Sequence, residues 1–136
     1  MKKSTGFLEI EHTADWEIQV WAPDFTTLFA VAAQGMYELS NTVLADSPRV
    51  MCDFEILFID HESLLVDFLS ELLFLGEDQG IAFDGYQFDL NDNSLKVHAN
   101  GAPIKNQSKE IKAVTYHGMK ILEKDSRLEV RIVFDV

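Results

Sequence analysis

The segment HESLLVDFLSELLFL, residues 61–75, decides the fold class of this chain. Its apolar residues recur at intervals of three and four, which is the spacing of one face of an α-helix. The apolar face consists of Leu64, Leu65, Phe68, Leu69, Leu72 and Leu73, and the opposite face of Ser63, Asp67, Ser70 and Glu71. Asp60 precedes the segment and is a favourable N-cap residue. The pattern predicts a helix that buries one face against another layer.

A second helix is predicted at about residues 25–40, after the N-cap candidate Asp24. Its apolar stripe consists of Leu28, Phe29, Ala32, Ala33, Met36 and Leu39. The rest of the chain alternates as strands do, at about 7–12, 16–21, 50–59, 82–90, 94–100, 110–121 and 127–134. Neighbouring strands with short turns favour antiparallel pairing. We therefore expect an α+β fold, a two-layer sandwich in which two helices cover one face of a mostly antiparallel sheet.

Length and composition limit the function classes. The 136 residues carry no internal repeat or low-complexity linker, so we expect one domain over 1–136. The net charge of −12 argues against a protein that binds nucleic acid directly. The one cysteine, Cys52, excludes an internal disulfide, and no apolar run is long enough to span a membrane. With no signal-peptide pattern at the start, a cytoplasmic protein is the default expectation.

The sequence contains no H-E-x-x-H, G-x-S-x-G or Gly-rich phosphate loop, and its histidines lack metal-ligand spacing. We therefore expect no enzymatic activity. A small hydrolase built on His12, Asp15 and Asp67 is disfavoured because no nucleophile or oxyanion device accompanies these residues.

Two polar places stand out near the predicted ends of strands. His12-Thr13-Ala14-Asp15 joins the first two strands, and Phe134-Asp135-Val136 ends the chain. If Asp15 lies beside the terminus, three hard oxygen donors converge, which suits Ca²⁺ or Mg²⁺. The alternatives are an Asx-turn at Asp15 and a terminus that frays into solvent.

A third place is Lys112-Ala113-Val114-Thr115-Tyr116-His117, where polar residues occupy both faces of the predicted strand. Such a pattern is typical of a strand whose exposed face is used for binding. It is equally typical of an edge strand that a lysine protects from aggregation.

Together these segments resemble the archease family. The shared motifs are H-T-A-D at 12–15, the helix LLVDFLSELL at 64–73, K-A-V-T-Y-H at 112–117 and the ending Phe134-Asp135-Val136. The resemblance implies a non-enzymatic activator of the GTP-dependent RNA ligase that acts in tRNA splicing and RNA repair. It also implies a bound divalent cation, typically calcium with magnesium or manganese as alternatives. The implied ligands are Asp15, Asp135 and a C-terminal oxygen of Val136.

The same resemblance implies that His12, Asp67, Lys112, Tyr116 and His117 form the surface presented to the ligase, which alone contacts the RNA. The chain departs from the family pattern at Gly101-Ala102-Pro103-Ile104-Lys105, where an acidic pair is absent, and at Asn106-Gln107. The alternative function is a chaperone-like module that modulates tRNA-modifying enzymes. That function needs an exposed apolar patch, for which Trp21, outward by strand parity, is the candidate.

Overall fold

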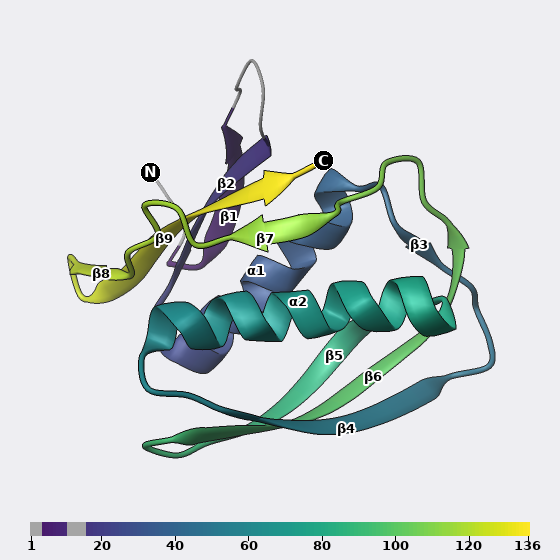
Figure 1. The fold of residues 1–136 in the computed structure, drawn as a ribbon, viewed down its shortest axis with the longest axis horizontal. Helices are drawn as coiled ribbons and strands as arrows, with labels where there is room; N and C mark the ends of the chain where they lie inside the picture. The colour runs from purple at the N-terminus through teal and green to yellow at the C-terminus, as the bar shows by residue number, and fades with distance from the viewer. Residues whose placement is uncertain (1–3, 11–15) are drawn as a thin grey trace.

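The computed structural model describes residues 4–10 and 16–136. Two helices and nine strands follow one another in these parts of the chain (Figure 1). Their bounds are β1 Gly6–Ile10, β2 Trp16–Ala22, α1 Phe25–Leu39, β3 Val43–Leu44, β4 Val50–Leu57, α2 His61–Gln79, β5 Ile81–Leu90, β6 Ser94–Asn106, β7 Ala113–Thr115, β8 Leu122–Lys124 and β9 Arg127–Asp135.

The strands form two antiparallel sheets. The first has the order β1-β2-β9-β7, with β8 also pairing with β9, and so joins the two ends of the chain. The second is built around the long strand β6, which pairs with β4, β5 and the short β3. The predicted α+β class and antiparallel pairing are confirmed, and the strands divide between two sheets instead of joining one.

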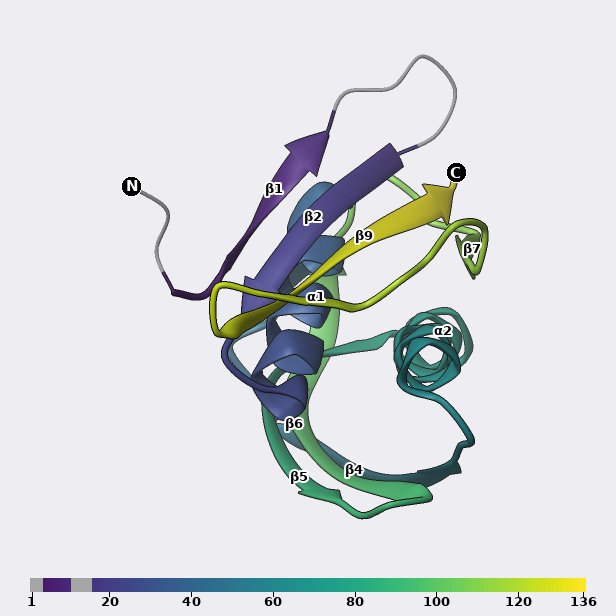
Figure 2. The ribbon, with the colours of Figure 1, turned by 90° about the vertical axis from the view of Figure 1, so that its left-hand side faces the viewer.

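The helices lie between the two sheets (Figure 2). Helix α1 contacts β1, β2 and β9 of the first sheet and β5 of the second, and α2 contacts β7 on one side and β4 and β5 on the other. Phe68 of α2 shows the consequence, because its ring is fully buried and packs against Phe29, Phe54, Tyr86 and Phe88. One core therefore joins both sheets through the helices.

Both helices begin where the sequence predicts. The side chain of Asp24 accepts a hydrogen bond from the backbone N–H of Thr27 at 2.8 Å, and that of Asp60 accepts one from Ser63 at 2.7 Å. Helix α2 runs to Gln79, one turn past its predicted end. Among the described residues, no helix is long and apolar enough to cross a membrane.

Two predictions about strands and exposure are wrong. The strand expected at 110–121 is only Ala113–Thr115, because the chain turns after it: the N–H of Met119 donates to the carbonyl of Tyr116 at 2.9 Å, and Gly118 has a φ of 67°. Trp21 does face away from the core side of its sheet, as parity predicts, but it is only 7% exposed. Its ring packs over Gly6, and the guanidinium of Arg127 lies 5.7 Å from the ring centroid. Trp21 therefore provides no apolar patch.

Candidate functional site

The predicted metal ligand Asp135 is the last residue of β9. Its side chain is exposed, and its carbonyl accepts a hydrogen bond from the backbone N–H of Lys112 at 2.8 Å. Val136 follows it at the surface. The predicted residues His12 and Asp15 lie outside the described residues; the described part of β2 begins at Trp16, which pairs with Phe134. The structure thus joins Lys112 to the C-terminal strand through the backbone.

The segment Lys112–His117 forms β7 and the start of the turn that follows it. Val114 points into the core, whereas Lys112, Tyr116 and His117 are exposed. The hydroxyl of Thr115 is buried and has no hydrogen-bond partner among the described residues. The mixed polarity of this segment therefore has a structural reason: one residue anchors it, and the residues at its two ends lie at the surface.

The structure brings two of the predicted surface residues together. Tyr116 is 53% exposed and lies over the polar face of α2, close to Ser63, Asp67 and Asp60. Partial burial raises the pKa of the Tyr116 phenol, the nearby carboxylates of Asp67 and Asp60 raise it further, and the Ser63 hydroxyl acts in the opposite direction. We call the group Ser63, Asp67 and Tyr116 the Tyr116 surface.

The N-terminus of α2 holds the turn that carries Tyr116. The carboxylate of Glu62 accepts a hydrogen bond from the backbone N–H of Ile121 at 2.9 Å, at the far end of the turn. The ring of His61 stacks on Phe25 with 3.8 Å between ring centroids, which fixes the start of the helix against α1. His61 thus has a structural role at the contact between α1 and α2.

Glu17 is a residue that sequence reasoning missed. It was indistinguishable from the exposed half of an alternating strand, yet it is only 6% exposed, and the guanidinium of Arg131 donates a hydrogen bond to it at 3.3 Å. Both Glu17 and Thr115 pair with Val133 of β9, so all three lie on the same outer face of the first sheet. The buried carboxylate of Glu17 and the buried hydroxyl of Thr115 thus lie beside Val133, two residues before Asp135 on the same face of the sheet.

The donor types at the chain end fit a hard divalent cation. The Asp135 carboxylate is the kind of oxygen donor that Ca²⁺ and Mg²⁺ prefer, and so is the C-terminal oxygen of Val136 that the resemblance implies. Within residues 4–10 and 16–136, no three His, Cys, Asp or Glu side chains gather to hold a metal ion.

The departures from the family pattern have structural roles. Gly101 and Ala102 are buried in β6, and the amide of Gln107 donates a hydrogen bond to the Thr42 hydroxyl at 3.0 Å. Gln107 thus connects the end of β6 to the segment before β3, whereas Gly101 and Ala102 pair with Phe83 and Ala82 of β5.

Comparisons with known proteins agree on one family. The model of the archease protein family matches residues 7–136. The chain is 32% identical to the protein archease of Methanothermobacter thermautotrophicus, over 96% of this chain and 99% of that one. It is 34% identical to the protein archease of Thermococcus kodakarensis, over 82% and 84%. A crystal structure from Thermotoga maritima, described as an archease and possible chaperone, superposes with a TM-score of 0.70 at 25% identity, covering 100% of this chain and 98% of that one. The chain therefore belongs to the archease family.

Proposed function

We propose that this chain activates a GTP-dependent RNA ligase, one that joins RNA ends bearing a 2′,3′-cyclic phosphate to 5′-hydroxyl ends in tRNA splicing and RNA repair. It acts without catalysing a reaction itself, by promoting guanylylation of the ligase and its turnover. We place this activity in the cytoplasm.

The observation that carries the proposal is the position of the predicted functional residues around β7. Asp135 pairs with Ala113 at the start of this strand, and Tyr116 follows its last residue, Thr115. Three strand residues span about 10 Å, so one partner surface can contact both ends at once. The Tyr116 surface contributes Asp67 to the same region.

Charge supports a ligase as the partner. A ligase must present positive potential to hold RNA, and a chain with a net charge of −12 is attracted to it. A divalent cation held by Asp15, Asp135 and the carboxylate of Val136 would supply positive charge near a nucleotide triphosphate. The chain's own contribution is to hold these oxygen donors at the end of β9 and to present Asp67, Lys112, Tyr116 and His117, with His12, around them.

The test is guanylylation of the ligase with GTP, with and without this chain at one tenth of the ligase concentration. We expect the chain to raise turnover at this dose. Asp135→Asn should reduce the effect at least about tenfold and weaken calcium binding measured by calorimetry. Glu123→Gln, which removes an exposed charge from β8, is the matched control and should act as wild type. A folded Asp135→Asn variant that activates fully would contradict the role of the chain end.

Asp67→Asn and Tyr116→Phe test the Tyr116 surface separately. Each should weaken the binding of chain to ligase while leaving calcium affinity unchanged, because neither residue is among the proposed ligands. Loss of calcium binding in either variant would contradict this division of roles.

A chaperone-like function is the second candidate, and exposed apolar side chains favour it. Ile59 is 97% and Leu57 74% exposed, and both lie in or just after β4, next to the start of α2. The Thermotoga maritima relative is described as a possible chaperone. This function predicts protection of a tRNA-modifying enzyme from aggregation at equimolar dose, and its loss in Ile59→Ser. Leu122→Ser is the control, since Leu122 is also exposed but lies on the first sheet.

A further inference from the structure

In the described part of the chain, strand β4 leaves one edge of the second sheet without a neighbouring strand. It pairs with β6 alone, over eight residues and without a shift in register. Because a strand directs backbone N–H and C=O groups to both of its sides, alternate residues of β4 direct theirs away from β6. Figure 1 shows β4 at the lower rim of the molecule, with α2 above it. Such an edge is a template for another strand.

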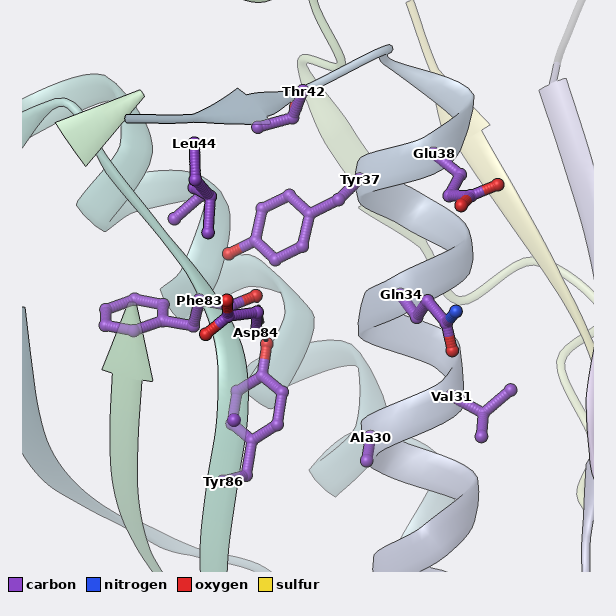
Figure 3. A pocket seen from close by; sticks show the side chains of 12 residues that line it. Ala30, Val31, Gln34, Tyr37, Glu38, Thr42, Leu44, Phe83, Asp84 and Tyr86 are labelled. Atoms are coloured by element: carbon purple, nitrogen blue, oxygen red, sulfur yellow. Dashed lines mark hydrogen bonds between the residues drawn. The ribbon is translucent and has the colours of Figure 1, made fainter. Parts of the chain in front are cut away.

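The opposite edge of this sheet is covered and irregular. Helix α1 contacts β5 there, and Tyr37 extends from the helix toward the strand (Figure 3). A bulge between Phe83 and Gly85 also shifts the register of β5 against β6. Coverage and bulges are two of the ways in which proteins protect sheet edges from other chains. By contrast, β4 has no bulge against β6, and its sequence, VMCDFEIL, contains no lysine or proline.

The apolar residues on the helix side of β4 are only partly covered. Cys52, Phe54 and Ile56 pack against the core from this strand but are half-buried. Their three partners in β6 are buried. The core is therefore complete over β6 and incomplete at β4. A strand added to this edge would cover the open side of the row, and the burial of apolar surface favours association.

Carboxylates line the helix side of this edge. A groove of about 500 Å³ lies between β4 and α2, with Asp67 and Glu71 of α2 in its lining. Among the described residues, no lysine, arginine or histidine lines it. Burial raises the pKa of the Cys52 thiol, and the carboxylate of Glu71 raises it further, which shows that Glu71 lies close to β4. Negative charge therefore lies beside the half-buried apolar row.

The outer face of the same edge differs in charge. There Asp53 forms a hydrogen bond with His98 of β6, and Glu55 lies directly opposite Lys96 in the register. Opposite charges in such positions stabilise a pair of strands. The helix side is therefore the face that favours positively charged side chains in a bound segment.

A second copy of this chain does not suit the edge. The antiparallel register that pairs Met51 with Leu57 of the copy also pairs Asp53 with Glu55, because two strands related by a two-fold axis oppose each other symmetrically. Like charges directly opposite each other destabilise a strand pair. Charge complementarity instead selects a basic segment of another protein as the occupant.

We propose that β4 accepts an extended basic segment of a protein partner as an additional strand of the second sheet. Backbone hydrogen bonds to the free edge hold the segment. Alternate lysine or arginine side chains lie on the helix side, where their aliphatic stems pack on Phe54 and Ile56 and their charged ends reach Asp67 and Glu71. The intervening side chains are apolar and lie on the outer face. This proposal does not depend on the ligase-activating role.

The test titrates the isotope-labelled chain with the blocked peptide Lys-Val-Lys-Val-Lys-Val-Lys, and separately with peptides that carry glutamate or threonine in place of lysine. We expect saturable shifts of the backbone signals of residues 50–57 with the lysine peptide, and at least about tenfold weaker binding of the other two. Equal binding of the threonine peptide would show a general apolar contact. Shifts of these signals when the chain alone is concentrated would show a second copy at the edge. Either result, or no shift in these residues with the lysine peptide, would overturn the proposal.

Two N-methylated forms of the lysine peptide test the strand pairing itself. One is methylated at the backbone nitrogens of the lysines and the other at those of the valines. In an added strand, only one of these two sets of N–H groups points to β4, because successive residues direct their N–H groups to opposite sides. One form should therefore bind as the unmethylated peptide does, and the other at least about tenfold more weakly. Equal binding of the two forms would contradict the addition of a strand.

Reversal of one charge tests the groove. Glu71→Lys should weaken the binding of the lysine peptide at least about tenfold and strengthen that of the glutamate peptide. The milder Glu71→Gln should weaken the lysine peptide about threefold. Glu77→Lys is the matched control, since Glu77 is exposed on another side of the same helix, near Ile104 and Gln107, and changes the net charge equally. Equal effects of Glu71→Lys and Glu77→Lys would show that only the overall charge attracts the peptide, and would overturn the assignment of the groove.

Discussion

Gly101 is the position where one added carbon should cost most. A β-carbon on Gly101 would lie 1.8 Å from the carbonyl oxygen of Ala82 and 2.8 Å from the α-carbon of Phe83. Both are backbone atoms of β5, so no change of rotamer relieves the clash, and the two strands must separate. Adding a methylene to a packed core costs about 1–3 kcal/mol where side chains can adjust. We therefore expect Gly101→Ala to lower the free energy of unfolding by about 3 kcal/mol or more.

Gly85→Ala is the matched control at the same bulge. There the nearest atom to an added β-carbon is the β-carbon of Asn100 at 3.8 Å, which is an ordinary contact. Its stability should stay within about 1 kcal/mol of wild type or rise slightly. Urea unfolding measures the free energy of unfolding of both variants. In thermal unfolding, Gly101→Ala should lower the Tm by about 10 °C. A loss of less than about 1 kcal/mol in Gly101→Ala would refute the argument that β5 and β6 approach too closely for any side chain.

Three further outcomes are expected. Asp24→Ala removes the N-cap of α1 and should cost about 1 kcal/mol in urea unfolding, whereas Asp46→Ala, in an exposed loop, should cost almost nothing. Phe68→Ala empties the centre of the aromatic core and should cost about 3–5 kcal/mol by the same measurement. Burial raises the pKa of Tyr37 and Tyr86 above the ordinary value of 10.0, so the unfolded chain loses these protons first. The free energy of unfolding should therefore fall as the pH rises above 10.0, and it should fall less steeply in Tyr86→Phe. The same dependence on pH in Tyr86→Phe and in wild type would contradict the burial of Tyr86 as its cause.

The starts of the helices could be predicted because their causes are local. Asp24 and Asp60 each bond an N–H only three residues ahead, and the apolar stripes behind them follow one spacing. The number of sheets could not be predicted in this way. Whether β2 pairs with β9 or with a strand of the middle segment depends on contacts between residues more than 100 positions apart. The alternating pattern of a strand is the same in either sheet.

For the side chains of β2, the exposed fraction was harder to predict than the face of the sheet on which each one lies. Strand parity predicts the correct outward direction for Trp21, but parity cannot say what lies over the outer face of the sheet. The turn after β7 runs across that face, since Gly118 and Lys120 lie beside Gln19 and Arg131. On the same face Trp21 packs over Gly6 beside Arg127, and Glu17 accepts a hydrogen bond from Arg131. Nothing in the sequence of β2 itself distinguishes these two residues from solvent-facing ones.

The Tyr116 surface shows the same limit at the candidate site. The sequence places Asp67 on the polar face of α2, and the motif places Tyr116 just after β7, but neither pattern brings the two together. Their meeting depends on the turn, which reverses at Gly118 and is tied to the helix by the bond from the Ile121 N–H to Glu62. Glu62 belongs to no motif and reads in the sequence as an ordinary first-turn acid that favours the helix dipole. The position of Tyr116 beside Asp67 thus rests on a backbone contact that only the folded chain reveals.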